Sequence, residues 1–200
     1  MILRWIQDKN LCIFSKGWPG SVATWLAAWS LWIPLYIHES DAIPGRSNRI
    51  LGELATKIFL GFEGAKQYLN SSKCEVIGQI LDPVFEWDTQ DIQYKIQWKT
   101  NKPHILVICG SQGSQAIFGS IIDQFSDSND YEWIIALWKL NSNMQNAFAT
   151  ISDCQALEWI SQSDIAHLIQ GTDIAITRWS ATTLAELTSF SESNTKLIII

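Results

Sequence analysis

The chain has 200 residues, of which 47% are hydrophobic and 17% charged, and this composition excludes an intrinsically disordered protein. The formal net charge of −6 falls entirely on residues 101–200, whereas residues 1–100 are neutral, and no basic run indicates a nucleic-acid surface. We therefore expect a folded protein with no nucleic-acid partner, whose two halves face different partners.

The cysteines and histidines form no disulfide or metal-binding pattern. The four cysteines lie far apart with no C-x-x-C pair, and Cys12 and Cys109 fall inside apolar runs. His38, His104 and His167 lack the spacing of metal ligands. The cysteines are therefore expected to be reduced thiols in a cytosolic protein.

The most apolar window, residues 22–37, is too short to span a membrane. It has about 16 residues and is interrupted by Pro34, whereas a spanning helix needs roughly 20. It also lacks the features of a cleaved signal peptide. We expect a buried helix followed by a buried strand.

Short apolar runs typical of strands alternate with segments of helical period along the chain. Before residue 79 we expect strands at Leu11–Ser15, Ile33–Ile37, Lys57–Gly61 and Glu75–Ile77, and helices at Ser21–Ser30 and Ser47–Thr56. After residue 103 we expect strands at His104–Cys109, Tyr131–Leu137, Asp173–Thr177 and Lys196–Ile200. We expect one helix directly after Gly113 and two more at Asp164–Gln170 and Ala181–Phe190, with Ser163 as the N-cap of the helix at Asp164–Gln170. The polar stretch between them has few periodic apolar residues and is typical of a linker.

This alternation predicts an α/β fold with two Rossmann-like lobes built on parallel sheets. The expected boundaries are residues 1–78 for the first lobe, 79–103 for the linker and 104–200 for the second lobe. The chain opens on "MILRWIQDKN", which has the pattern of a helix end, and closes on the strand "KLIII". We therefore expect each lobe to be incomplete and the chain to be a fragment.

The sharpest local motif is "ILVICGSQGSQ", where a buried strand stops at Gly110 and a loop closed by Gly113 opens a helix. Such a loop presents backbone N–H groups and the positive end of a helix dipole to an anion, most plausibly a diphosphate. Ser111 adds a hydroxyl donor. The G-x-x-G spacing does not meet the dinucleotide fingerprint, and a plain strand-to-helix turn explains it equally well.

A second motif is "TDIAITRWSATTLAEL", in which a strand delivers Arg178 to a loop and the next helix carries Glu186. A carboxylate accepts hydrogen bonds from both hydroxyls of a ribose diol, and the hydroxyls of Thr182 and Thr183 suit a phosphate. Taken alone, Glu186 reads more simply as a solvated helix residue.

A third motif is "HESDAIPG", residues 38–45, directly after a strand. The carboxyl ends of strands in open α/β sheets are where ligand contacts occur, which favours a role for His38 and Glu39. Taken alone, a satisfied loop histidine is the simpler interpretation.

Together, these motifs resemble those of the MurG family, N-acetylglucosaminyltransferases that convert lipid I to lipid II. That family carries "SKGG", "IPxxIHEQNAIPG", "ATK", "GNP", "VLVxGGSQGA" and "ADxxxxRxGAxTxxE" in this order. The matching segments are Ser15–Gly17, Ile33–Gly45, Ala55–Lys57, Gly78, Ile105–Ser114 and Thr172–Glu186. The resemblance covers nearly the whole chain.

The resemblance implies a two-lobed GT-B glycosyltransferase that binds UDP-GlcNAc in its second lobe and a lipid-linked acceptor in its first. The implied UDP-GlcNAc contacts are Asp41, Gly110, Ser111, Gln112, Gly113, Ile160, Ala181, Thr182, Thr183, Leu184, Ala185 and Glu186. Within this set, Ser111 meets the diphosphate, Glu186 the ribose, Ile160 the uracil and Asp41 the donor sugar. His38 and Glu39 lie on the acceptor side.

The same resemblance implies an inverting transfer of GlcNAc to undecaprenyl-linked lipid I in peptidoglycan synthesis. It also implies a location in the cytoplasm, peripheral on the inner face of the cell membrane. No cofactor is implied, and no metal is expected at the diphosphate, because helix dipoles and N–H groups supply the positive field there.

Several positions depart from the family pattern. Asp41 replaces an asparagine, and Asp82 takes the place of the arginine in "GNPxR" that helps to hold the base. The glycine-rich "GGTGGH" loop, whose histidine is a candidate base, has no match in the chain. The catalytic residue is therefore unknown, and we expect the chain to be inactive by itself.

Several of the 11 tryptophans stand where the family has, or would naturally have, glycine. These are Trp18, Trp25, Trp29, Trp32, Trp87, Trp138 and Trp179, whereas Trp133 and Trp159 read as core aromatics. Glycine serves where φ is positive or backbones approach closely, and tryptophan does neither without strain. Our hypothesis is that UGA codons meant as glycine were read here as tryptophan. The alternative is an aromatic membrane-facing patch.

Two other classes of function remain open at this stage. One is a different GT-B UDP-sugar enzyme, either a diacylglycerol glycosyltransferase or a UDP-GlcNAc epimerase. The other is a non-catalytic nucleotide-sugar-binding module. The "HESDAIPG" segment argues against the first, because it belongs to the acceptor side of the MurG family.

Overall fold

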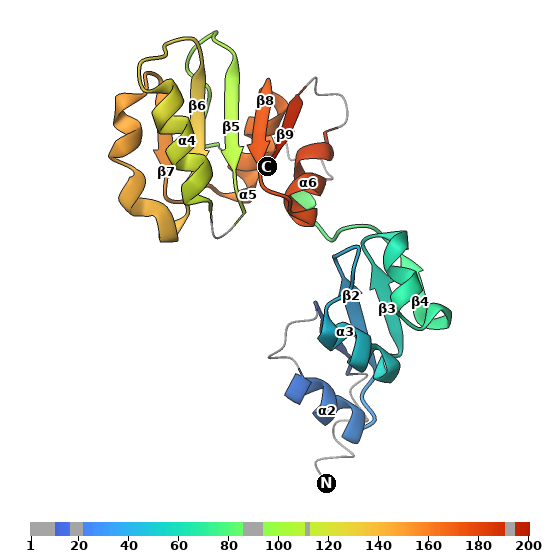
Figure 1. Cartoon of the computed structure of the whole chain (residues 1–200). Helices are drawn as coiled ribbons and strands as arrows, with labels where there is room; N and C mark the ends of the chain where they lie inside the picture. The colour runs from blue at the N-terminus through green and yellow to red at the C-terminus, as the bar shows by residue number, and fades with distance from the viewer. Residues whose placement is uncertain (1–10, 17–21, 86–93, 111–112, 191–194) are drawn as a thin grey trace. The chain divides into compact units, whose positions relative to one another are not determined.

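The computed structural model describes residues 11–16, 22–85, 94–110, 113–190 and 195–200. The chain divides into two compact units, Met1–Ile80 and Leu81–Ile200 (Figure 1). Each unit is built on one sheet whose described strands are all parallel. The predicted α/β class with two parallel sheets is therefore confirmed.

The first unit has a four-stranded sheet in the order β1-β2-β3-β4. Its strands are β1 (Ile13–Ser15), β2 (Leu35–Glu39), β3 (Lys57–Leu60) and β4 (Cys74–Val76). Its helices are α2 (Val22–Ser30), α3 (Arg46–Leu51) and the short 3₁₀ segments Gly52–Leu54, Glu63–Tyr68 and Ser71–Lys73. Ile37, Ile58 and Leu60 pack with Trp25 of α2 to form its core.

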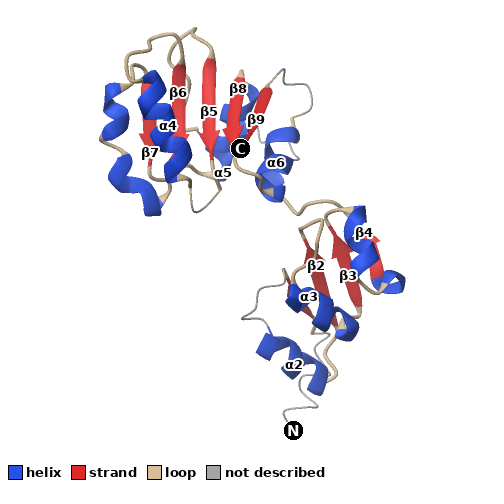
Figure 2. Ribbon diagram, viewed as in Figure 1, coloured by secondary structure: helices blue, strands red, loops and turns tan. Residues whose placement is uncertain are grey.

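The second unit has a five-stranded sheet in the order β7-β6-β5-β8-β9 (Figure 2). Its strands are β5 (His104–Ile108), β6 (Glu132–Ala136), β7 (Cys154–Leu157), β8 (Ile174–Thr177) and β9 (Lys196–Ile199). Its helices are α4 (Gln115–Phe125), α5 (Gln162–Gln170), α6 (Ala181–Thr188) and the 3₁₀ segments Pro83–Phe85, Lys139–Met144 and Ala147–Thr150.

Strand β5 is central and buried on both faces, as its unbroken apolar run predicts. Leu106 and Ile108 pack with residues of α5 and α6, whereas Ile105 and Val107 pack with α4 on the opposite face (Figure 2). The chain order reverses at β5, because β6 lies on one side of it and β8 on the other. The loops that leave β5 and β8 therefore emerge side by side at the carboxyl edge of the sheet, which is where open α/β sheets bind ligands.

Two local predictions need correction. The N-cap of α5 is Ser161, not Ser163, because the Ser161 hydroxyl accepts the Asp164 amide at 3.1 Å. Strand β7 was not predicted, because only Ala156 of its four residues is buried and the run shows no apolar alternation.

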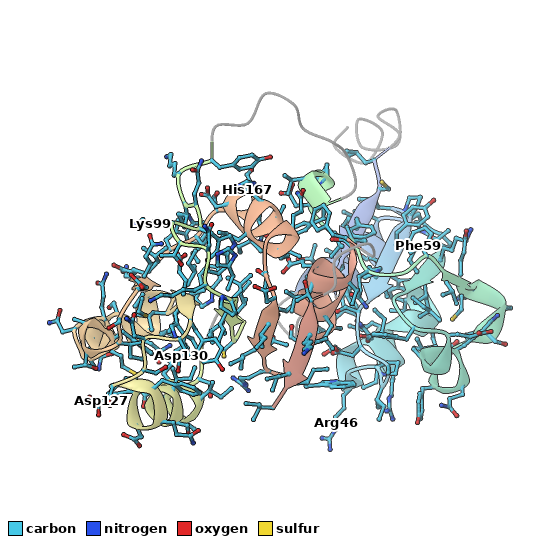
Figure 3. The ribbon with its side chains drawn as sticks, turned by 90° about the horizontal axis from the view of Figure 1, so that it is seen from above. Arg46, Phe59, Lys99, Asp127, Asp130 and His167 are labelled. Atoms are coloured by element: carbon cyan, nitrogen blue, oxygen red, sulfur yellow. The ribbon has the colours of Figure 1, made fainter. Side chains whose placement is uncertain are left out.

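From Leu81 onward, the described parts of the predicted linker pack onto the second unit. Val84 and Phe85 belong to its core, and the amides of Lys95 and Ile96 donate to Asp164 at 2.7 and 3.2 Å. Tyr94 stacks on His167 of α5 with ring centroids 4.1 Å apart; His167 is labelled in Figure 3. The backbone N–H groups of this stretch satisfy buried carboxylates, a role that its polar sequence did not indicate.

Trp32 and Trp138 have backbone conformations that suit glycine. Trp32 has φ +56°, and Trp138 has φ +57° with ψ 163°. The second combination is essentially restricted to glycine, and either one strains a bulky residue. The indole N–H of Trp138 is also buried without a partner among the described residues. The backbone thus supports the glycine hypothesis at these two positions.

The other tryptophans give no such support. Trp25 fills the core of the first unit, and Trp29 and Trp179 are exposed without a positive φ. Trp18 and Trp87 lie outside the described residues. Of the two predicted core aromatics, Trp133 is buried, but Trp159 is 71% exposed, so that prediction was wrong.

Replacing Trp32 with glycine should stabilise the protein by about 1 kcal/mol. The Trp32 side chain is 88% exposed, so little packing is lost, while a left-handed conformation costs a residue with a Cβ roughly 1–2 kcal/mol. Trp29→Gly is the matched control, because it removes an exposed indole from inside α2 and should destabilise by about 1 kcal/mol. Urea unfolding of both variants measures this, and a destabilising Trp32→Gly would contradict the backbone argument.

Candidate functional site

The loop between β5 and α4 is a tight turn closed by two glycines. Gly110 has φ +69° and Gly113 has φ +66°, and the Gly113 amide donates to the Gly110 carbonyl at 3.0 Å. Ser114 follows as the N-cap of α4, so the first-turn N–H groups of this helix begin directly beside the loop. Ser111 and Gln112 lie outside the described residues. The geometry suits an anion at the helix N-terminus.

Gly113 is required for steric as well as torsional reasons. A Cβ atom at this position would lie 2.3 Å from Asn141 Nδ2 and 3.1 Å from the Leu137 carbonyl oxygen. Asn141 is itself buried and donates from Nδ2 to that carbonyl at 3.0 Å. The 3₁₀ segment after β6 therefore presses against the glycine loop. Sequence reasoning missed Asn141, because no local motif marks it.

Arg178 ties the loop after β8 to the loop after β5. Its Nη1 donates to the Gly113 carbonyl at 3.1 Å, and its backbone N–H contacts the Cys109 thiol. Burial raises the pKa of Cys109 to about 11, with Arg178 partly opposing this rise, so the thiol stays protonated near neutral pH. The sequence placed Arg178 in a loop, but only the fold reveals that it holds the predicted diphosphate loop.

Helix α6 presents the second group of predicted residues. Its N-cap is Ser180, whose hydroxyl accepts the Thr183 hydroxyl at 3.3 Å, so Thr183 is buried and engaged. Residues Ala181, Thr182, Leu184 and Ala185 are partly exposed along the same helix. Glu186 is only 9% exposed, which excludes the solvated helix residue that its local sequence suggested.

Glu186 carries an unusual charge environment. Burial, followed by the nearby Asp82 carboxylate, raises the pKa of Glu186 to about 7. Asp82 also accepts the Val84 amide at 3.1 Å, which fixes it at the start of its 3₁₀ turn. An acidic side chain thus stands near Glu186 at the position where the family pattern has arginine.

We expect the titration of Glu186 to change the free energy of unfolding with pH. The folded-state pKa of about 7 lies above the ordinary value of 4.5, so the folded state binds the proton more tightly. The contribution of Glu186 to the free energy of unfolding is fully present below pH 4.5 and is lost as the pH rises to about 7. Glu186→Gln should remove this loss. Urea unfolding from pH 4.5 to 8 measures it, and parallel pH profiles of the two proteins would contradict the shift.

Ile160 was expected near a uracil, but its side chain is 1% exposed and lies in the hydrophobic core. It precedes the Ser161 cap of α5, so any contact with a ligand would have to use its backbone. The side chain of Ile160 supports the fold there.

The third motif forms a network inside the first unit. His38 is fully buried and donates from Nε2 to the Gly78 carbonyl at 3.0 Å. Glu39 is 3% exposed and accepts from the loop that follows it. Asp41 is exposed. Of these three, only Asp41 therefore presents its side chain at the surface, whereas His38 and Glu39 act within the protein.

The described part of the chain contains neither a metal-binding cluster nor a membrane-spanning helix. No three His, Cys, Asp or Glu residues there gather as a potential metal site. The helices described are all too short or too polar to cross a bilayer. The four cysteines are all unpaired.

Comparison with solved structures defines the class of protein. MurG of Acinetobacter baumannii superposes with a TM-score of 0.65 at 18% identity, covering 98% of this chain and 63% of that one. S. aureus MnaA, solved with UDP, gives 0.70 at 15% identity over 99% of this chain and 59% of that one. The fold, with a glycine loop and a helix meeting at the edge of the second sheet, is that of the two-lobed GT-B proteins.

Sequence comparisons show which enzymes the chain resembles. Residues 2–60 match the glycosyltransferase family 28 N-terminal domain. The UDP-N-acetylglucosamine--N-acetylmuramyl-(pentapeptide) pyrophosphoryl-undecaprenol N-acetylglucosamine transferase of Geobacillus kaustophilus is 31% identical over 185 residues, 92% of this chain and 51% of the relative. The enzyme of the same name from Synechococcus elongatus is 33% identical over 164 residues, 80% of this chain and 44% of the relative. The chain is similar to MurG enzymes over most of its own length, and it spans about half the length of these curated relatives.

Proposed function

We propose that this chain is part of an inverting transferase that moves GlcNAc from UDP-GlcNAc to lipid I, giving lipid II for peptidoglycan synthesis. The names of its curated relatives state this donor and acceptor chemistry. The observation that carries the proposal is the contact of Arg178 with the Gly113 carbonyl, because it joins two of the predicted donor-binding segments. We also propose that the protein acts at the cytoplasmic face of the membrane, where lipid I would be the acceptor.

The roles of the donor-binding residues follow from their chemistry. The N–H groups in the first turn of α4, beside the Gly110–Gly113 loop, would stabilise the diphosphate without a metal. The Glu186 carboxylate would accept both hydroxyls of the ribose. In the reaction, an acceptor hydroxyl attacks the anomeric carbon of GlcNAc, the bond to the diphosphate oxygen breaks, and UDP leaves with the bonding electrons. The same N–H groups would stabilise the charge that develops on UDP.

Titration with UDP tests the donor site directly. We expect calorimetry to detect UDP binding, and Glu186→Gln to weaken it by about tenfold, because one charge-assisted acceptor is lost. Since only the carboxylate form of Glu186 would bind the diol well, UDP affinity should rise about tenfold from pH 6 to pH 8 in the unmodified protein. Glu158→Gln is the matched control, an exposed glutamate of the same unit, and should leave affinity unchanged.

The reaction itself is tested by assaying GlcNAc transfer to lipid I, with diacylglycerol as the competing acceptor and UDP-GlcNAc epimerisation as a second readout. Binding without turnover is expected of these 200 residues alone, and that inactivity stays a prediction. Failure to bind UDP would overturn the proposal. Epimerisation of UDP-GlcNAc, or transfer of GlcNAc to diacylglycerol, would show that the protein is one of the other UDP-sugar enzymes instead.

A further inference from the structure

Residues 94–100, which we call the strap, are attached to the second unit almost entirely through side chains. They form no helix or strand, and none of their backbone groups pairs with another described backbone group. Backbone pairs normally make up about two-thirds of the hydrogen bonds in a protein. Because the strap depends on side chains of the unit instead, its attachment can change without any change in a β-ladder or a helix.

Asp164 of helix α5 holds the first part of the strap. Its side chain is buried, and its Oδ1 accepts the amides of Lys95 and Ile96 at 2.7 and 3.2 Å. Burial by itself would raise the pKa of Asp164, but hydrogen bonds from the Ser161 hydroxyl and from these two amides lower it below its usual value. The strap therefore stabilises the charged form of Asp164, and charge-assisted bonds of this kind are stronger than bonds between neutral groups.

Glu132 of strand β6 holds the last part of the strap. Its Oε1 accepts the Lys99 amide at 2.8 Å, and its Oε2 accepts the amide and the hydroxyl of Thr100, each at 2.8 Å. Every described hydrogen bond to this buried carboxylate thus comes from the strap. Lys99 is labelled in Figure 3. The strap therefore ends on a second buried charge, which belongs to a different element from the first.

Trp98 stands between the two pairs of amides. Its Nε1 donates to the Leu168 carbonyl at 3.2 Å, and its ring stacks on His104 with the centroids 4.3 Å apart and an interplanar angle of 3°. Gly171 leaves room for the indole, because a Cβ there would lie 3.0 Å from Trp98 Cδ1. One residue separates Trp98 from the first pair of amides and none separates it from the second, so movement of either pair displaces the indole.

The strap can lift without leaving a buried charge unpaired. When it lifts, water replaces its amides at Asp164 and Glu132, so the cost is the net value of these bonds rather than the full penalty of a buried charge. Strands β5 and β6 stay paired through their own ladder, and α5 keeps its own backbone bonds. We propose that the strap opens and closes as one unit on an intact second sheet, which exposes the two carboxylates and the Trp98 indole together. This device is independent of the function proposed above.

Native-state hydrogen exchange in low concentrations of urea tests the proposal on the unmodified protein. After correction for intrinsic rates, the amides of Lys95, Ile96, Lys99 and Thr100 should report one opening constant with one urea dependence. The amides of β5 and β6 should show a smaller opening constant and a steeper urea dependence, because they open only when the whole unit unfolds and exposes more surface.

Asp164→Asn tests whether the two ends of the strap are coupled. Asparagine keeps the size of the side chain but removes its charge, so exchange of the first pair of amides should accelerate at least about tenfold. If the strap is one unit, the second pair, which does not touch Asp164, accelerates by the same factor, and Glu132→Gln gives the reciprocal result. Asp123→Asn is the matched control, an exposed aspartate on α4, and should leave exchange of the strap unchanged.

Two results would overturn the inference. Acceleration confined to the pair nearest the substituted carboxylate would show that the ends of the strap open separately. Strap amides that exchange only together with those of β5 and β6 would show that the strap does not open on an intact sheet. Exchange of β5 and β6 in the same sample reveals any variant that fails to fold, and the urea series on the unmodified protein then still decides the question.

Discussion

Gly113→Ala is expected to destabilise the protein by about 3 kcal/mol and to abolish measurable UDP binding. Two costs add here: a Cβ in the left-handed region is worth roughly 1–2 kcal/mol, and overpacking a filled space roughly 1–3 kcal/mol. The second cost arises because the new Cβ would lie 2.3 Å from Asn141 Nδ2, whose position is set by its bond to the Leu137 carbonyl. Relief would require the 3₁₀ segment after β6 to move. Urea unfolding and calorimetry with UDP measure the two effects.

Two other glycines of the same unit serve as controls for Gly113. Gly110 has φ +69° but open space around its Cβ direction, so Gly110→Ala should cost only the torsional strain, about 1–2 kcal/mol. Gly119 lies inside α4 with open space and no positive φ, so Gly119→Ala should stabilise by about 0.5–1 kcal/mol. Equal effects at positions 110 and 113 would refute the steric role of Asn141.

Glu132→Gln is expected to destabilise the second unit by about 2–4 kcal/mol. The Glu132 carboxylate is 1% exposed and accepts the amides of Lys99 and Thr100 at 2.8 Å each, and also the Thr100 hydroxyl at 2.8 Å. His104 Nε2 lies 3.7 Å away. An amide NH₂ at this place would face donors, so part of the network must break. Lys99, labelled in Figure 3, belongs to the segment that this carboxylate fastens to β6.

The matched control for Glu132 is Glu75→Gln in β4. Glu75 pairs with Lys57, but both side chains are about half exposed, so the change should cost less than about 1 kcal/mol. Urea unfolding of both variants, followed by circular dichroism of the backbone, measures the two costs. A cost at Glu132 no larger than that at Glu75 would show that the segment before β5 is held by its apolar contacts instead.

Polar side chains mark the limit of what could be predicted for the candidate site. The turn at Gly110 and Gly113 was predictable, since a glycine pair directly after a buried strand is typical of positive φ values. Glu186 was also named, but its burial was not, because helical spacing does not reveal what packs against a helix. Three other residues were missed or interpreted differently, because their roles depend on partners elsewhere in the chain. Gln79 bonds to Ser40, 39 positions away, and Asn141 bonds to Leu137, 4 positions away. Asp82 acts on Glu186, 104 positions away.

The role of the predicted linker was also not visible in the sequence. Its polar composition was interpreted as a linker, yet the amides of Lys95 and Lys99 satisfy the buried carboxylates of Asp164 and Glu132. Backbone N–H groups cannot be recognised in a sequence, so a segment that binds helix α5 and strand β6 through them looks like a free connection.

The amino-acid sequence by itself determined the alternation of strands and helices, the parallel sheets and the resemblance to the MurG family, because periodicity and glycine placement act over a few residues. The tertiary structure alone decided that Arg178 reaches Gly113, that Glu39 serves its own loop, and that Glu186 is buried beside an acid. These facts depend on which strand ends become neighbours when the sheet forms, and hydrogen bonds and desolvation at those ends have no counterpart in local sequence.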